Sequence, residues 1–247
     1  MACRDEIVTY ADALLDAARW PEFAPAGLQV VGGEEVTTLV SGVSASRDLF
    51  VEAAARGAEM VLVHHGLFWR NEPLVVDARL RGRLEALFAA EMSLVAYHLA
   101  LDAHGELGNA AQLARALGTT PGGPFAEVGV AAACDPPLPL AELVARVAVA
   151  TEREPVVLAG GPPEVGRVAV VTGGGGYELL RAAREGFDVL VTGEPEEPSA
   201  AAARELGITL IAAGHHATER LGVQALGAHL AERFGIRHAY VEIANPV

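Results

Sequence analysis

The chain has 247 residues, 51% of them hydrophobic and 20% charged, so it can bury a substantial core in one large domain or two small ones. A net charge of −14, with no offsetting arginine run, argues against nucleic acid as a partner. No run of about 18 apolar residues occurs, and the acid-bearing N-terminus lacks the apolar core of a signal peptide. We therefore expect a cytoplasmic protein that does not enter the membrane, with Cys3 and Cys134 as reduced thiols.

Helical and strand patterns alternate along the first half of the chain, which indicates an α/β fold. In chain order, the patterns predict a helix over residues 4–19, a strand over 38–43, a helix over 48–56, a strand over 59–63, a helix over 80–90, a strand over 93–97 and a helix over 108–117. The last of these helices stops at a glycine, which is a common helix terminator.

The middle of the chain, residues 118–166, is rich in proline and glycine. It still contains one helical pattern, over 140–150, so we interpret it as a connecting subdomain and not as a disordered linker. A strand over 168–171 follows it. Near the end of the chain the patterns predict a helix over 218–234 and a closing strand over 238–243.

The second half of the chain repeats the first. Residues 43–65 align with residues 172–194, and both segments read as a turn, an amphipathic helix, a helix-ending glycine, an acid and a buried strand. The two glycines are Gly57 and Gly186. This correspondence predicts a duplicated αβ unit.

The next segments align as well. Residues 93–102 correspond to 209–219: in each, a strand leads to a histidine, and a carboxylate follows four residues later. We predict a first αβ repeat over 1–125. The connecting segment and the second repeat then occupy 126–247.

Histidines and carboxylates follow the strands of both repeats. In open α/β sheets, ligands bind beyond the carboxyl ends of the strands, so these side chains are expected at one edge. Four of the six end a strand, one lies in the loop after its strand, and one lies in the first turn of a following helix. They are His64, His65, His98, Asp102, His215 and Glu219.

Imidazole and carboxylate together are the ligand set of zinc, manganese or iron. Side chains of adjacent strand residues diverge, so His64 and His65 are each expected to hold one of two ions about 3.5 Å apart. We assign the bridging carboxylate to Glu219, whose longer side chain can reach both ions. The predicted ligands of the two divalent ions are His64, His65, Asp102, His215 and Glu219.

Other residues near these segments have two readings each. His98 is either a further ligand or a group that orients Asp102 or a bound water, and in a catalytic site it would transfer protons. Glu194 aligns with His65 and either lines the site or is an exposed acid. The glycine-rich turn at residues 172–176 suits either phosphate binding at a helix start or a simple tight turn, and it lacks the lysine of a P-loop. Structural or solvent-facing roles are expected for His104, His216, His229 and His238.

At these residues the chain resembles a known family, the dinuclear-metal proteins named GTP cyclohydrolase I type 2 homologues, which are similar to NGG-interacting factor. The resemblance covers nearly the whole length. It rests on the segments GLQV (27–30), VHHGLFW (63–69), YHLALDAHGELGNAAQLA (97–114), TGE (192–194) and AGHHATERLGV (213–223). The resemblance implies two intertwined repeats with mixed, mostly parallel sheets, a homohexameric ring, and a two-metal centre on the five ligands named above.

Two departures from the family pattern affect the surroundings of the ligands and not the ligands themselves. Residues 24–26 replace a stretch that commonly contains asparagine, and Leu99-Ala100 replaces a frequent Thr-Asn pair. Both can alter the substrate pocket.

Two functions remain open at this point. The first is a metal-dependent hydrolase acting on a nucleotide-like small molecule, as in GTP cyclohydrolysis. Few basic residues accompany the ligand segments, with Arg70 and Arg220 nearest. The alternative is a metal-binding or regulatory assembly without catalysis, for which the same ligands suffice. A ring that threads single-stranded nucleic acid would need basic and aromatic residues, and this chain has only 5% aromatic residues.

Overall fold

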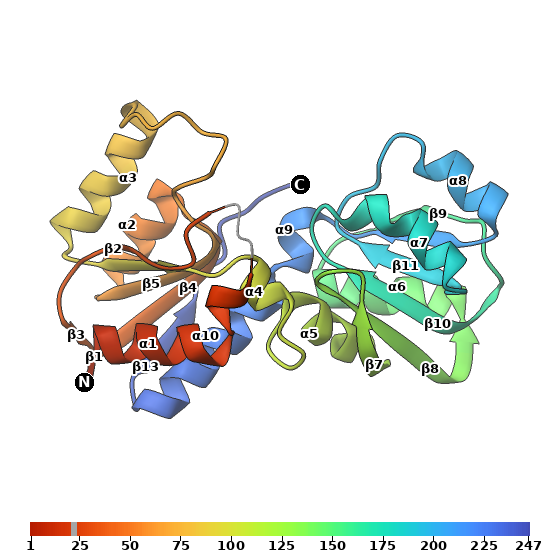
Figure 1. Cartoon of the computed structure of the whole chain (residues 1–247), viewed down its shortest axis with the longest axis horizontal. Coiled ribbons are helices and arrows are strands. Elements are labelled where there is room, and N and C mark those ends of the chain that lie inside the picture. Colours follow the sequence, from red (N-terminus) through yellow and green to blue (C-terminus); the bar gives the residue numbers. More distant parts are fainter. Residues whose placement is uncertain (21–23) are drawn as a thin grey trace. The chain divides into compact units, whose positions relative to one another are not determined.

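The structure, a computed structural model, describes residues 1–20 and 24–247 and contains two compact units (Figure 1). The first unit comprises residues 1–101 and 223–244, and the second comprises 102–222 and 245–247. Each unit is built on its own mixed β-sheet. The fold is therefore α/β with mixed sheets, as the sequence predicts.

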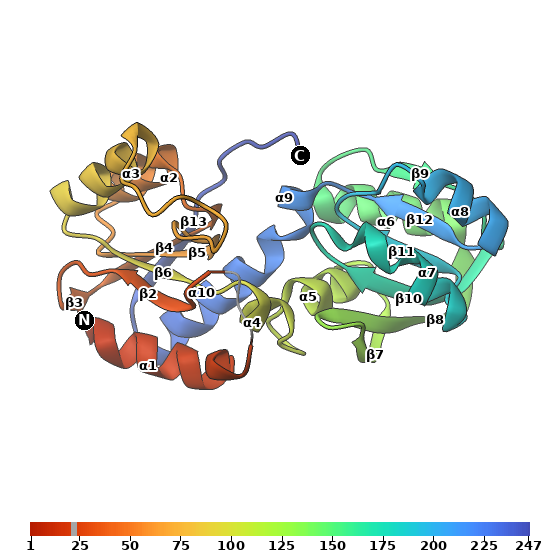
Figure 2. The same cartoon turned by 45° about the horizontal axis from the view of Figure 1, so that its top comes forward.

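The first unit contains a five-stranded sheet in the order β13-β4-β5-β6-β2 and a small antiparallel pair, β1-β3. Strands β13, β4, β5 and β6 run parallel, and β2 is antiparallel to β6. Figure 2 shows α2 and α3 on one face of this sheet and α1 on the other. The elements are β1 (Ala2–Cys3), α1 (Arg4–Leu14), the 3-10 helix η1 (Ala17–Arg19), β2 (Gly27–Val30), β3 (Glu35–Val36), β4 (Thr38–Ser44), α2 (Arg47–Ala55), β5 (Met60–His65), α3 (Ala78–Ala89), β6 (Ser93–Ala96) and β13 (Arg237–Tyr240).

Local sequence signals account for most of these boundaries. Helix α2 begins after Ser46, whose hydroxyl accepts a hydrogen bond from the Leu49 amide, and it ends before Gly57, which has a φ of 66°. Helix α1 is shorter than the predicted 4–19. It stops because Asp16 adopts a left-handed conformation, with a φ of 49°. The strand predicted over 59–63 extends further and includes both histidines of β5.

The second unit contains a six-stranded sheet in the order β7-β8-β10-β11-β12-β9. Its three central strands, β10, β11 and β12, are parallel, and their neighbours are antiparallel to them. Helices α4 and α10 extend across the boundary between the units. The remaining elements in chain order are α4 (Leu99–Asp102), α5 (Asn109–Ala116), β7 (Thr120–Phe125), β8 (Gly129–Pro139), α6 (Leu140–Thr151), β9 (Val156–Leu158), β10 (Glu164–Val171), the 3-10 helix η2 (Gly175–Glu178), α7 (Leu179–Arg184), β11 (Val189–Thr192), α8 (Ser199–Leu206), β12 (Thr209–Ala212), α9 (His215–Thr218) and α10 (Arg220–Phe234).

The sheet of the second unit is covered on both faces, because its buried strand residues alternate between two cores. Val168 and Val170 of β10 belong to a core that includes residues of α5 and α6. Ala169 and Val171 belong to a second core, with residues of α7 and α8. The sheet is therefore the middle layer of this unit, and ligands of such sheets bind beyond the carboxyl ends of the strands.

Three strands lie in the proline- and glycine-rich stretch 118–166, where the sequence analysis predicted only a helix. Strands β7 and β8 form an antiparallel pair at one edge of the sheet, and β9 forms the other edge. Pro136 and Pro137 fall where the register between β8 and β10 shifts, between the pairs formed by Val165 and Arg167. Proline is tolerated in such bulges and edges, although it lowers strand propensity in a sequence window.

The predicted duplication is visible as two sets of three parallel strands, β4-β5-β6 and β10-β11-β12. The aligned glycines both take positive φ, 66° for Gly57 and 75° for Gly186. The predicted boundary between residues 125 and 126 describes the duplication of sequence and stays a prediction. The compact units divide elsewhere, between Leu101 and Asp102.

No helix within residues 1–20 and 24–247 is long and apolar enough to cross a membrane.

Candidate metal centre

Three imidazoles lie together in the first unit. His64 and His65 are the last residues of β5, and His98 follows β6, the parallel neighbour of β5. The ring centroid of His64 lies 4.7 Å from that of His65 and 4.8 Å from that of His98. One nitrogen from each ring can be chosen so that all three lie within 4.8 Å of one another. This group can hold a metal ion.

The orientation of His64 is set by the strand beside it. Its Nδ1 lies 2.9 Å from the backbone oxygen of Tyr97, so Nδ1 carries the proton and Nε2 carries the lone pair that a metal needs. Tyr97 is itself fixed, because its hydroxyl donates to Asp12 Oδ1 at 2.6 Å. Burial raises the pKa of Tyr97, which keeps this donor protonated.

His65 is held in a similar way. Its Nδ1 lies 3.1 Å from the hydroxyl of Ser44, the residue opposite it in the β4–β5 register. The rings of His64 and His65 are closer together than strand alternation predicts, with centroids 4.7 Å apart. The two side chains were expected to diverge, and their rings do not.

The second unit supplies a histidine between two carboxylates. His215 begins α9, and its Nδ1 lies 2.5 Å from Glu194 Oε1. Its Nε2 lies 3.2 Å from Oε2 of Glu219, whose residue surface is only 3% exposed. The hydrogen bond to Glu219, reinforced by Glu194, raises the pKa of His215 to about 9. Glu194 is thus a partner of His215 and not simply an exposed acid.

Glu219 lies at a break in the chain's last long helix. The predicted helix over 218–234 is two helices in the structure, α9 and α10, with Glu219 as the residue between them. Thr218 supports this break, since its hydroxyl lies 2.9 Å from the backbone oxygen of Gly214 and accepts from the Gly173 amide at 3.0 Å.

The glycine-rich turn packs directly against the side chains of His215 and Glu219. Gly173 has a φ of 60°, and a Cβ on it would lie 2.1 Å from Glu219 Oε1 and 3.0 Å from His215 Nε2. Its carbonyl accepts from the amides of Gly193 and Glu194 at 3.0 and 2.9 Å. The turn is therefore a tight turn whose lack of side chains makes room for Glu219.

Asp102 is held by a residue that the sequence analysis did not single out. Asp102 is the last residue of α4, not a loop residue as predicted, and it is buried. The Asn109 side chain donates to Asp102 Oδ1 at 2.8 Å, and its oxygen accepts from the Gly222 amide at 2.7 Å. An asparagine at a helix start normally suggests a cap for its own helix, so this longer contact has no signal in the sequence.

Replacing Asn109 with alanine should weaken both stability and metal binding. The change leaves the Gly222 amide buried without its acceptor, which costs about 1–3 kcal/mol of unfolding free energy. It also frees the Asp102 carboxylate to rotate, and loss of such an orienting partner typically lowers metal affinity by about 10–100-fold. Thermal unfolding and competition with a chelator would measure the two effects. Gln112→Ala, which removes a hydrogen bond to Glu106 from the same helix, is the control. Equal metal affinities for the two variants would contradict this role of Asn109.

The raised pKa of His215 predicts a pH dependence for the metal-free protein. Its pKa is about 9 in the folded chain against 6.5 for an ordinary histidine. The stabilisation from its proton is therefore fully present below pH 6.5 and is lost as the pH rises through about 9. A metal ion bound at Nε2 would have to displace that proton, so the affinity of such a site should rise up to about tenfold per pH unit towards pH 9. Titrations of stripped protein at several pH values test this; a pH-independent affinity would contradict it.

The remaining histidines have other hydrogen-bond partners. His104 Nδ1 accepts from the amides of Glu106 and Leu107. His229 Nε2 lies 2.8 Å from the Tyr10 hydroxyl, and His238 Nε2 lies 2.8 Å from the Ser41 hydroxyl. The backbone amide of His216, whose side chain is buried, donates to the Val247 oxygen.

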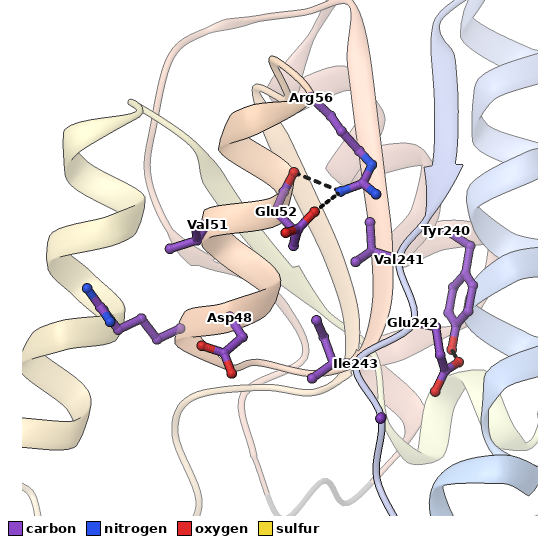
Figure 3. A pocket seen from close by; sticks show the side chains of 10 residues that line it. Asp48, Val51, Glu52, Arg56, Tyr240, Val241, Glu242 and Ile243 are labelled. Atoms are coloured by element: carbon purple, nitrogen blue, oxygen red, sulfur yellow. Dashed lines mark hydrogen bonds and ion pairs between the residues drawn. The ribbon is translucent and has the colours of Figure 1, made fainter.

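A separate hollow of about 710 Å³ lies between α2 and the segment after β13 (Figure 3). Its lining contains no histidine. Arg56 forms an ion pair with Glu52 at 2.7 Å, and the Tyr240 hydroxyl donates a hydrogen bond to Glu242. These charged side chains of the hollow therefore already have partners. The imidazole and carboxylate groups described above are better candidates for metal binding.

The fold and these groups define an α/β protein with histidine and carboxylate side chains, at the carboxyl ends of parallel strands in both units, that can hold metal ions. The chain belongs to the Duf34/NIF3 (NGG1p interacting factor 3) family, whose model matches residues 2–246.

Relatives of known sequence and structure agree with this assignment. The chain is 45% identical over 247 residues to a GTP cyclohydrolase 1 type 2 homolog of Pseudomonas aeruginosa, covering 97% of each chain. It is 43% identical over 233 residues to the protein of the same name from Escherichia coli K12, covering 94% of each. A solved structure described as protein ybgI, of unknown function, matches with a TM-score of 0.96 and 41% identity over 100% of both chains. TTHA1606 from Thermus thermophilus matches with a TM-score of 0.92 and 36% identity, also over 100% of both.

Proposed function

We propose that the protein binds two divalent ions, of zinc, manganese or iron, and that Glu219 bridges them. The proposed ligands are His64, His65, Asp102, His215 and Glu219. The observation that carries this proposal is how the imidazoles are held. In both units an oxygen engages a histidine Nδ1, Tyr97 O for His64 and Glu194 Oε1 for His215, which would make Nε2 the nitrogen that binds a metal.

The donor set fits such ions. Three imidazoles and two carboxylates suit zinc, manganese or iron, and the imidazoles disfavour calcium and magnesium, which prefer oxygen ligands. The carboxylates of Asp102 and Glu219 are buried, where a negative charge is costly unless a cation or a hydrogen bond compensates it.

We further propose that the bound ions serve hydrolysis of a nucleotide-like small molecule. A pair of divalent ions lowers the pKa of water and polarises an electrophilic group of the substrate. His98 lies beside His64 and His65 and is placed to move a proton, while Glu194 fixes the tautomer of His215. The names of the relatives suggest GTP as the first substrate to test.

A nucleotide substrate needs positive charge for its phosphates, and the second unit offers more of it than the sequence analysis recognised. Arg153 packs on Gly214, the residue before His215: a Cβ on Gly214 would lie 2.2 Å from Arg153 Nη1. Arg220 follows Glu219 directly, with its side chain 3.5 Å from Glu152. These two arginines are the proposed phosphate contacts.

The test is turnover of GTP by protein loaded separately with zinc, manganese and iron, followed by chromatography. His98→Gln should keep its metal content and lose at least about 100-fold in rate, the usual scale for a proton-transfer group. Full metal occupancy without turnover of GTP or other nucleotides would favour the alternative, a non-catalytic metal-binding or regulatory protein.

Two further features belong to the same proposal: an assembly that the family resemblance implies, and a location that the sequence predicts. We propose that the chain assembles as a homohexamer, which light scattering of the purified protein would test. We also propose that it functions in the cytoplasm, in keeping with its two cysteines outside any disulfide.

A further inference from the structure

A second hollow, of about 570 Å³, lies in the loop between β5 and α3, directly after His65. This size is typical of small-molecule pockets. Most of its lining is apolar or aromatic. The residues that matter here are Phe68, Trp69, Leu74, Val75, Val76 and Leu80.

Trp69 forms a wall that the hollow shares with the imidazole group. Its ring meets the ring of His98 edge-on, with centroids 5.2 Å apart, and lies 5.8 Å from the ring of His65. The indole Nε1 donates to the Gly66 carbonyl at 3.2 Å, which fixes the plane of the ring. A group bound against Trp69 therefore lies next to the candidate metal ligands of the first unit.

Hydrogen bonds within the chain hold the loop in shape. Gln29, from the GLQV segment, accepts a hydrogen bond from the Leu67 amide at 2.8 Å, and its amide group packs on Gly66, where a Cβ would lie 2.3 Å from Gln29 Nε2. Further along, the amide of Glu72 donates to Trp69 O at 3.0 Å. The hollow is thus a preformed feature, which lowers the entropic cost of binding.

The charged residues that line the hollow already interact with neighbouring groups of the chain. Arg79 pairs with Glu72 at 2.9 Å, and Asp77 caps α3 by accepting from the Leu80 amide. Because these polar groups are already engaged and most of the lining is apolar, the hollow favours a neutral apolar or aromatic group.

We propose that this hollow binds the planar heterocyclic ring of the substrate, with Trp69 as its stacking surface. The proposal rests on the proposed function, since it supplies the ring site for a nucleotide whose reacting atoms lie at the metals. Leu74, Val75 and Val76 are highly exposed, Leu74 at 102%, and a ring covering them would remove apolar surface from water. Stacking of a base on an aromatic side chain tolerates different bases and contributes about 1–3 kcal/mol to the binding free energy.

The test uses guanosine, which has the ring without the phosphates, and metal-loaded protein. Trp69 is made the only tryptophan by Trp20→Phe, and its fluorescence is followed during titration. We expect saturable quenching by guanosine. Leu74→Ser should weaken binding about fivefold, as expected for roughly 1 kcal/mol of apolar contact. Leu74 makes so little contact with the fold that this variant should fold normally. Val149→Ser, at a residue 79% exposed on α6, is the matched control and should bind like the parent.

Absence of saturable quenching by guanosine, adenosine and uridine would overturn the ring site. If metal content then stays at two ions per chain, the proposed metal centre survives this failure. The ring site would also be overturned by a second result: quenching that depends on protein concentration, together with a molar mass that changes in the Leu74→Ser variant. That result would show that a second copy of the chain covers the hollow.

Discussion

Glu219→Gln is expected to leave a folded protein with fewer than one metal ion per chain. The substitution preserves the shape of a buried side chain but removes its charge, and a neutral amide is a poor bridge between two divalent ions. The position is tightly packed, because Glu219 Oε2 lies 3.2 Å from His215 Nε2 and Gly173 leaves room for Oε1 only by lacking a side chain. Metal content by mass spectrometry, after reconstitution and desalting, measures the effect.

The matched control is Glu197→Gln, in the exposed loop near Glu194. It removes the same charge and should retain both ions. Glu194→Gln should fall between the two, because Glu194 orients His215 and is not itself a proposed ligand. A Glu219→Gln protein that keeps two ions per chain would rule out the bridging role.

Gly173→Ala is expected to cause the largest combined loss of stability and metal. An L-residue at a φ of 60° costs about 1 kcal/mol or more, and the new methyl group would lie 2.1 Å from Glu219 Oε1. Relieving that overlap costs roughly 1–3 kcal/mol and displaces a proposed bridging ligand. Chemical denaturation and metal analysis of the same preparation would show both losses.

Gly174→Ala offers a close control for this experiment. Gly174 is the next residue of the same turn, its φ is −78°, and a Cβ there meets nothing within 4 Å. The free energy of unfolding of this variant should lie within about 0.5 kcal/mol of the parent's, as is usual for surface substitutions, and the variant should bind metal normally. If both alanine variants behave alike, the close packing of Gly173 on Glu219 has no functional consequence.

The sequence predicted the strands that carry the histidines because both signals are local. Buried apolar runs such as residues 61–63 and 93–96 lead to histidines, and the duplication repeats the second of these runs at Thr209–Ala212 before His215. The parallel arrangement of these strands then follows from the alternation of helix and strand. The family resemblance implied the same fold class, which the structure confirms.

What the sequence did not predict depends on contacts between distant segments. Asn109 acts on Asp102 and on Gly222, 113 residues further along the chain. The Tyr97 carbonyl orients His64 across neighbouring strands, and Gly173 matters because of the distant Glu219 carboxylate. No residue pattern within a short window encodes such pairs.

The missed strands have a different cause. Strand β7 reads TPGGPF, a composition that normally indicates a turn, and it is a strand because it pairs with β8 at the edge of a sheet. Tertiary pairing overrides weak local propensity there.

Metal analysis of the untagged wild-type protein tests the central claim most directly. Purified chain, stripped and reconstituted with zinc, manganese or iron, should retain close to two ions per chain after desalting. No retained ion with any of the three metals would contradict a dinuclear centre, and the histidines at the strand ends would then serve the fold alone.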